Sequence, residues 1–151
     1  MTAASLTPVA APSILSADFS RLAEAVALAD PARDWVHCDV MDWQFVPNLT
    51  FGPLVVAAVQ RLTQAFIEAH LMVVQPERMV RAFREAGADQ ITVHLEACSD
   101  PGVVLDQVRA SGARAGLAIK PKMFASTIST APYDTLRSID DHSPAEKHSF
   151  R

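Results

Sequence analysis

The stretch Trp35-Val-His-Cys-Asp-Val-Met41 is a short run rich in apolar and β-branched residues, with polar groups at positions 37 and 39. A helical pattern that begins at Pro53 follows it, since a proline at the first helical position costs no hydrogen bond. A second strand-like run covers residues 66–73. This order of strand, helix and strand is typical of a parallel α/β sheet.

The same alternation continues on both sides of this unit. We predict strands over residues 9–16, 35–41, 66–73, 90–96 and 114–119. We predict a helix from Asp18 to about Asp30, a short helix from Pro53, and helices from Pro76 to Gly87 and from Pro101 to Gly112. Four β-α units plus a fifth strand fit either an open doubly wound sheet or part of a (β/α)8 barrel. A complete barrel needs about 200 to 250 residues, so this chain would supply a little over half of one.

The character of the chain changes after Pro121, where Ser, Thr, Asp, His and Pro become frequent. We expect residues 8–121 to form the partial barrel domain. Residues 122–151 show no clear periodicity, and we expect them to form a divergent, flexible tail.

Composition excludes several classes of protein. The chain has 151 residues, of which 50% are hydrophobic and 20% charged, as in globular proteins. Its net charge of -4 argues against nucleic-acid and anionic membrane partners. No signal peptide and no apolar run of about 18 residues is evident, so we expect a cytoplasmic protein. Cys38 and Cys98 lack the paired spacing of a zinc site, and we interpret them as reduced thiols.

Two neighbouring predicted strands carry the residues best suited to chemistry. His37, Asp39 and Met41 share one face, because side chains alternate along a strand, and Glu68 and His70 share a face on the next strand. Adjacent parallel strands would bring these groups about 5 Å apart. They could bind one metal ion or act as an acid-base pair. The alternative is a set of hydrogen-bonded polar pairs at a loop edge.

Other polar residues give weaker signals. His94 and Glu96 repeat the arrangement on a third strand, and we assign them a core or outer role because three strands of ligands would overfill one site. Ser13 could reach a ligand or simply form a turn. Lys120 ends the last predicted strand, but its spacing supports no specific role.

Six motifs together resemble the ribulose-phosphate 3-epimerase family in order and spacing. They are Ala11-Pro-Ser-Ile-Leu-Ser-Ala-Asp18, His37-Cys-Asp-Val-Met-Asp42, Phe45-Val-Pro-Asn48, His70-Leu-Met72, Val93-His-Leu-Glu-Ala97 and Gly116-Leu-Ala-Ile-Lys-Pro121. The resemblance covers about residues 8–121. It implies a (β/α)8 barrel, an isomerase of the pentose phosphate pathway that interconverts D-ribulose 5-phosphate and D-xylulose 5-phosphate, and a divalent cation, either zinc, iron, manganese or cobalt.

The resemblance also implies roles for individual residues. His37, Asp39 and His70 correspond to metal ligands, and Asp39 also to the acid-base group on one face of the substrate. Ser13 and His70 correspond to substrate-binding residues. Met41 and Met72 would form an apolar wall around the reacting carbon. The partners implied are a small phosphorylated sugar and further copies of the same chain.

This sequence departs from the family pattern in three ways. The family's second catalytic aspartate and its phosphate-binding glycines follow later strands, and residues 122–151 do not match them, so we expect a truncated or alternatively ended chain with a one-sided site. Glu68 stands where the family has aspartate, and Trp43 where it has glycine. The alternative function is therefore a non-catalytic half barrel that binds metal or self-associates.

Overall fold

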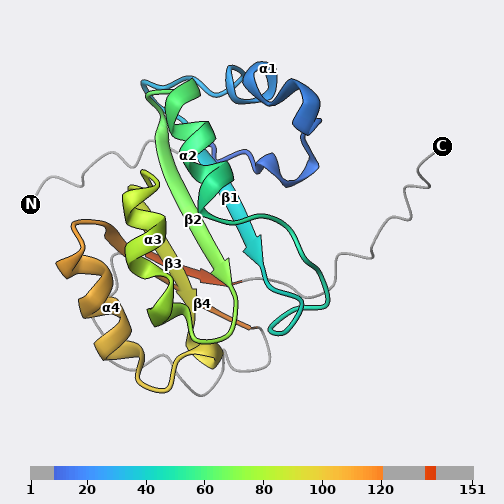
Figure 1. The fold of residues 1–151 in the computed structure, drawn as a ribbon. Helices are drawn as coiled ribbons and strands as arrows, with labels where there is room; N and C mark the ends of the chain where they lie inside the picture. The colour runs from blue at the N-terminus through green and yellow to red at the C-terminus, as the bar shows by residue number, and fades with distance from the viewer. Residues whose placement is uncertain (1–8, 121–134, 139–151) are drawn as a thin grey trace, which may run out of the picture.

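Five parallel strands form one sheet in the order of the sequence in the computed structural model, which describes residues 9–120 and 135–138 (Figure 1). The strands are β1 (Trp35–Met41), β2 (Phe66–Met72), β3 (Gln90–His94), β4 (Arg114–Ile119) and β5 (Thr135–Ser138). The α-helices are α1 (Leu22–Val26), α2 (Pro53–Leu62), α3 (Val80–Glu85) and α4 (Pro101–Ala110).

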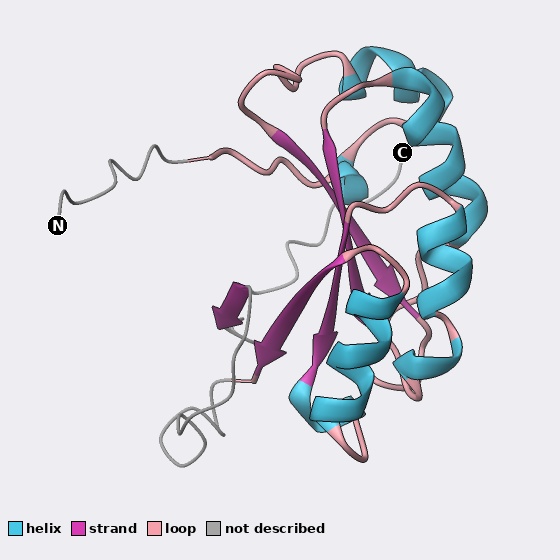
Figure 2. Cartoon of the chain, turned by 90° about the vertical axis from the view of Figure 1, so that its left-hand side faces the viewer, coloured by secondary structure: helices cyan, strands magenta, loops and turns pink. Residues whose placement is uncertain are grey.

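All four helices lie on one side of the sheet, and the strands fan out on the other (Figure 2). A doubly wound sheet carries helices on both faces and reverses its strand order, whereas a barrel keeps sequential order with helices outside. The fold is therefore an arc of a (β/α) barrel, which decides between the two architectures that the sequence left open.

The hydrophobic core lies between the sheet and its helices. Alternate residues of each strand point toward the helices, so Cys38 and Val40 of β1 are buried on this side, as the period of two predicts. Across the sheet this layer includes Ile67, Ala69, Leu71, Ile91, Val93, Ala115 and Leu117, and the helices contribute Val56, Val59, Val80, Phe83, Val104, Leu105 and Val108. This apolar layer leaves the other face of the sheet free to carry polar groups.

Helix ends follow the predicted signals. Pro53 and Pro101 open α2 and α4, and the Asp100 side chain caps α4 by accepting from the Val103 backbone N–H at 3.2 Å. Gly87 follows α3 with a φ of 102°, a conformation that glycine adopts without steric cost. The helix predicted from Pro76 begins instead as a 3-10 turn over Pro76–Arg78.

The predicted strand over residues 9–16 is reduced to an isolated bridge between Ser13 and His37. The Ala10 and Pro12 carbonyls accept from β1, at 2.8 and 2.9 Å, so the segment does run beside that strand. Prolines lack an N–H to donate, and the Ser13 hydroxyl accepts from the Leu15 N–H and turns the chain into a 3-10 turn over Ile14–Ser16.

The helix predicted from Asp18 to about Asp30 is also shorter than expected. Asp18 caps a 3-10 turn, Phe19–Arg21, through the Ser20 N–H, and the α-helical part is limited to Leu22–Val26. Arg21 has a φ of -125°, outside the helical range, which separates the two turns.

The strand predicted over residues 90–96 ends at His94, and Leu95–Ala97 forms a 3-10 turn. This turn lets a Glu96 carboxylate oxygen accept from the Lys120 backbone N–H at 2.6 Å, at the end of β4. Glu96 therefore does not repeat the strand position of the other carboxylates.

The predicted division at residue 121 falls largely outside the described residues. Within the predicted tail, β5 pairs in parallel with β4, from Gly116 opposite Thr135 to Ile119 opposite Ser138. The periodicity of the sequence had indicated no element there.

The amino-terminal end of the sheet is closed by aromatic packing. The rings of Trp35 and Phe66 lie 4.4 Å apart, and the Arg114 guanidinium covers both at 5.3 and 5.4 Å. These three residues begin the strands β1, β2 and β4. The cluster stabilises one end of the barrel arc and leaves the other end for the site.

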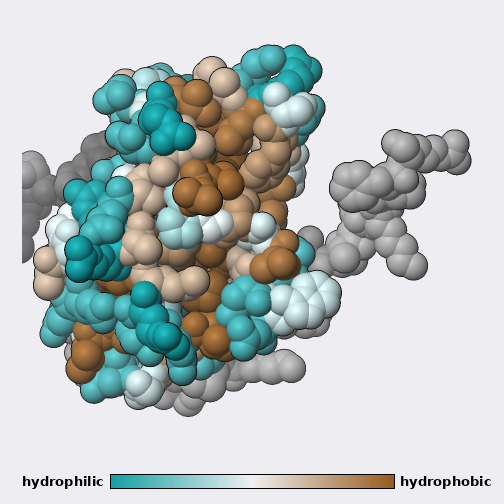
Figure 3. Space-filling model, in the orientation of Figure 1, coloured by the Kyte–Doolittle hydropathy of each residue, from teal (hydrophilic) through white to brown (hydrophobic). Residues whose placement is uncertain are grey.

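The outer surface mixes hydrophilic groups with scattered hydrophobic ones (Figure 3). Leu28 and Leu54 are the most exposed large hydrophobic side chains of the described region. Among the described helices, none has both the length and the apolar character needed to cross a membrane.

Candidate functional site

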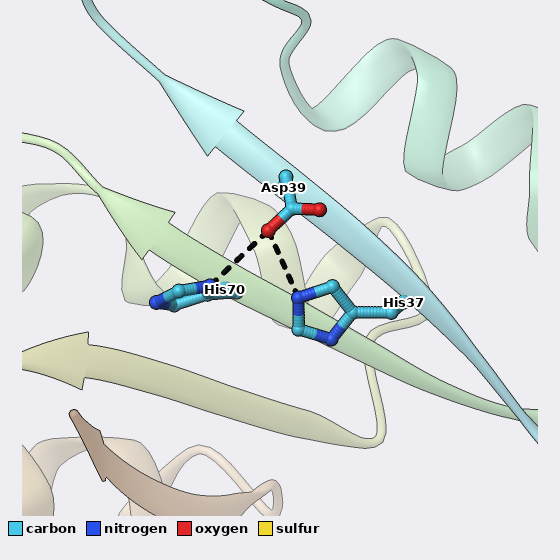
Figure 4. Close-up of side chains that lie close together, drawn as sticks. All are labelled: His37, Asp39 and His70. Carbon is cyan, nitrogen blue, oxygen red and sulfur yellow. Dashed lines mark hydrogen bonds and ion pairs between the residues drawn. The ribbon is translucent and has the colours of Figure 1, made fainter. Parts of the chain in front are cut away.

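His37, Asp39 and His70 converge on the polar face of the sheet, toward the carboxyl ends of β1 and β2 (Figure 4). Asp39 lies directly opposite His70 in the parallel register. Each residue offers one ligand atom, and these three atoms lie within 4.8 Å of one another. The alternation of side chains and the parallel pairing predicted this convergence.

Asp39 is the centre of the cluster. Its Oδ1 lies 2.9 Å from His37 Nε2 and 3.2 Å from His70 Nδ1. Its other oxygen, Oδ2, accepts a hydrogen bond from the Ser13 hydroxyl at 2.5 Å. The structure thus brings Ser13 to the site as well, in contact with Asp39.

These contacts set the charges of the site. Burial alone would raise the pKa of Asp39, but hydrogen bonds from His37, His70 and Ser13 hold it well below its ordinary value. Burial would lower the pKa of His37, yet Asp39 and Glu68 together raise it to about 9. Asp39 is therefore ionised, and His37 is protonated at neutral pH in the metal-free chain.

Behind His37 lies a wholly buried carboxylate, Glu68. Its Oε2 is 2.9 Å from His37 Nδ1, while its Oε1 accepts from the Thr92 hydroxyl at 2.7 Å and from Gln90 Nε2 at 3.0 Å. Glu68 lies on the same face as His70, as the sequence predicted, but its oxygens contact His37, Thr92 and Gln90 and it is not one of the three converging ligands. Gln90 and Thr92 were not identified from the sequence, although their alternation with the apolar Ile91 was the available signal.

Behind His70 lies His94, which has the outer position that we expected. The Nε2 atoms of the two rings are 3.0 Å apart, and the rings stack with centroids 5.0 Å apart. Burial, with the charges of His70 and Lys120, lowers the pKa of His94 to about 3, so this ring is neutral. Its Nδ1 is 3.6 Å from Glu96 Oε2, and neither atom has a hydrogen-bond partner.

The remaining predicted residues lie around this centre. Met41 and Met72 pair with each other in the register at the carboxyl ends of β1 and β2. The Lys120 ammonium sits 4.1 Å from the centroid of the Phe45 ring, which in turn packs 4.9 Å from the ring of His94. Phe45 is a neighbour of the site that sequence reasoning gave no role.

Trp43 has a φ of 65°, in the left-handed region that favours glycine. The following loop is nonetheless well anchored. Asp42 accepts from the N–H groups of Gln44 and Phe45 and, with its second oxygen, from Val74 at the end of β2. The glycine that the family places at position 43 would fit this turn without strain.

The donor set fits a divalent transition metal. Two imidazole nitrogens and one carboxylate oxygen suit zinc, iron, manganese or cobalt, and three protein ligands leave positions open for substrate. Both histidines also have a polar group on the other ring nitrogen, as metal-ligating histidines usually have.

Comparison with known proteins identifies a family that matches most of the chain. Residues 9–136 match the model of the ribulose-phosphate 3 epimerase family. The ribulose-phosphate 3-epimerase of Synechocystis sp. is 51% identical over 116 residues, which are 75% of this chain and 50% of that protein. That of Mycobacterium tuberculosis is 47% identical over 114 residues, or 76% and 49%. The chloroplastic ribulose-5-phosphate-3-epimerase of Arabidopsis thaliana is 45% identical over 123 residues, or 80% and 44%.

The match to the family model extends about 15 residues beyond the motifs, to the start of β5. The chain spans about half the length of the curated relatives it matches. With the (β/α) arc and the converging histidines and carboxylate, these matches leave one conclusion: the chain belongs to the ribulose-phosphate 3-epimerase family.

Proposed function

We propose that this chain carries the metal-binding half of an epimerase site that interconverts D-ribulose 5-phosphate and D-xylulose 5-phosphate at C3. The observation that supports it most is the convergence of His37, Asp39 and His70 within 4.8 Å at the carboxyl ends of two strands, where barrel enzymes place their sites. The relatives are named for this activity, and they are about twice as long as the aligned region.

The reaction requires a weakly acidic proton to leave a carbon beside a ketone. A divalent metal held by His37, Asp39 and His70 would polarise the ketone oxygen and stabilise the negative charge that develops there. Asp39 is the group that takes the proton, since its carboxylate is ionised and its side chain is more exposed, at 14%, than those of His37 and His70, at 9% and 3%. Ser13, now bonded to Asp39 Oδ2, can turn its hydroxyl to the substrate.

The surroundings support this chemistry. Met41 and Met72 stand at the ends of β1 and β2 and would keep water from the reacting carbon, which strengthens the local electrostatic interactions. Zinc, iron, manganese and cobalt stay the candidates for the metal, and self-association and a cytoplasmic location stay predictions. Inversion of the carbon needs a second acid on the opposite face of the substrate, in addition to Asp39.

The test is proton NMR of ribulose 5-phosphate in deuterium oxide with the metal-loaded chain. Formation of xylulose 5-phosphate would establish the complete reaction. Deuterium uptake at C3 without xylulose 5-phosphate would establish that a proton is removed and a deuteron returned on one face of the substrate. If metal binds and neither signal develops, the epimerase proposal is wrong, and the alternative of a half barrel that only binds metal or self-associates is favoured.

A further inference from the structure

Glu68 is a buried carboxylate that the proposed chemistry does not use. Its side chain has no exposed surface, and a charge in such a place is stable only with close partners. Thr92 and Gln90 donate to Oε1 from the neighbouring strand, at 2.7 and 3.0 Å. The other oxygen, Oε2, faces His37 Nδ1 at 2.9 Å. The donors on Oε1 fix the carboxylate so that Oε2 points at the ring.

The position of Thr92 depends in turn on a residue of β4. A Cβ added at Gly116 would lie 2.1 Å from the Thr92 hydroxyl oxygen and 2.9 Å from its Cβ, closer than atoms can approach. Gly116 is paired with Thr92 in the register. Three adjacent strands therefore cooperate to hold one carboxylate oxygen against His37.

The two histidines of the cluster present different ring nitrogens to Asp39. His37 uses Nε2 and His70 uses Nδ1. A neutral imidazole carries its proton on one nitrogen only, and the other nitrogen holds the lone pair that a metal needs. A carboxylate oxygen can only accept, so Glu68 at Nδ1 favours the form whose lone pair is on Nε2, in competition with Asp39, which accepts at Nε2 while no metal is bound.

We propose that Glu68 is a positioning residue that holds His37 with its proton on Nδ1 and its Nε2 directed at the metal. This inference rests on the proposed metal site. Glu68 touches neither metal nor substrate and acts only through His37. Removing such an outer partner typically weakens metal binding by about 10- to 100-fold.

The first test is calorimetric titration with zinc of the wild-type chain, of Glu68→Gln and of Glu85→Gln. Glu85 is a surface carboxylate of α3 that pairs with Arg81, so its variant controls for the loss of a charge. We expect about 10- to 100-fold weaker binding for Glu68→Gln and no change for the control. Cobalt absorption spectra should show an altered coordination for Glu68→Gln, which a loss of stability alone would not produce. Wild-type affinity together with a wild-type cobalt spectrum in Glu68→Gln would overturn the inference.

A second measurement needs no metal and no activity. Proton-nitrogen NMR of the His37 ring, recorded at a pH at which the ring is neutral, reports which nitrogen carries the proton. Because Asp39 competes at Nε2, we expect a larger share of the form protonated on Nδ1 in the wild-type chain than in Glu68→Gln. The same share in the two proteins would refute the role of Glu68, even if the metal binds.

The two tests separate this inference from the proposed function. Failure of the wild-type chain to bind metal or to exchange the C3 proton counts against the proposed function, while the ring spectrum still decides the role of Glu68. Should Glu68→Gln fail to fold, Thr92→Val is the second variant, because it loosens Glu68 without removing it. Its expected effects are smaller and have the same direction, and unchanged zinc affinity with an unchanged ring spectrum would overturn the inference.

Discussion

Gly116→Ala should destabilise the chain far more than a glycine substitution in a strand normally does. The added methyl would meet the Thr92 hydroxyl at 2.1 Å and the Thr92 Cα, a backbone atom, at 3.2 Å, so rotating the side chain relieves only part of the clash. Overpacking of this kind costs about 1–3 kcal/mol. Displacing the Thr92 hydroxyl from the buried Glu68 carboxylate costs about 1–3 kcal/mol more. Alanine regains about 0.5–1 kcal/mol of the entropy that glycine loses on folding.

We therefore expect a net loss of about 1–5 kcal/mol in the free energy of unfolding, measured by urea denaturation followed by circular dichroism. The matched control is Gly52→Ala, because nothing lies within 4 Å of a Cβ at Gly52. Thr92→Ala removes the closest clashing atom, so the double variant should be less destabilised than the sum of the two single changes. Equal stability of Gly116→Ala and Gly52→Ala, or strict additivity with Thr92→Ala, would refute the reasoning.

Three further predictions concern the site and its loop. Asp39→Asn should abolish deuterium exchange at C3, because an amide cannot take the proton. The control, Asp106→Asn, changes an exposed carboxylate and should leave the exchange intact. Exchange that survives in Asp39→Asn would remove Asp39 from the mechanism. Zinc at about 100 times its Kd should raise the free energy of unfolding of the wild-type chain by about 2.7 kcal/mol in thermal denaturation, and His70→Ala should lose most of this gain. Equal stabilisation of the wild-type chain and of His70→Ala would place the metal elsewhere. Burial would raise the pKa of Asp42, but the backbone N–H groups of Val74, Phe45 and Gln44 together hold it below its usual value. The stabilising effect of these hydrogen bonds is therefore complete above the unfolded pKa of about 3.9 and is lost as the pH falls through the folded pKa. Asp42→Asn should thus be less stable than the wild-type chain at neutral pH and equal to it in acid; a difference that persists in acid would contradict this origin.

Much of the fold could be predicted because the strands and helices have strong, local signals. The strands from Trp35, Phe66 and Arg114 begin where alternation and flanking polar residues placed them. The segment over residues 9–16 could not be predicted correctly, since its form depends on Ser13 bonding to Leu15 and Asp39 rather than on its apolar content. To choose between an open sheet and a barrel arc, one must know on which side of the sheet each helix packs. The periodicity of the sequence does not contain this information.

The candidate site was predictable to the extent that it follows from pairing. Alternation along β1 and β2 puts His37, Asp39 and His70 on one face of the sheet, and the parallel register places Asp39 opposite His70. The outer partners depend on side-chain length and on the space left by other strands. That Glu68 turns back to His37 instead of joining the ligands follows from donors on Thr92 and Gln90, which belong to a strand 22 and 24 positions further along the chain.

The two faces of the sheet have separate tasks, and this separation explains how a small arc tolerates so many buried polar groups. His37, Glu68, His70, Gln90, Thr92 and His94 are all buried on the face without helices. Such groups cost free energy unless they bond to one another, and here each has a partner on a neighbouring strand. The opposite face buries apolar side chains under the helices and supplies the stability. The polar face can therefore be organised for chemistry, with Asp39 ionised at its centre and a histidine on either side.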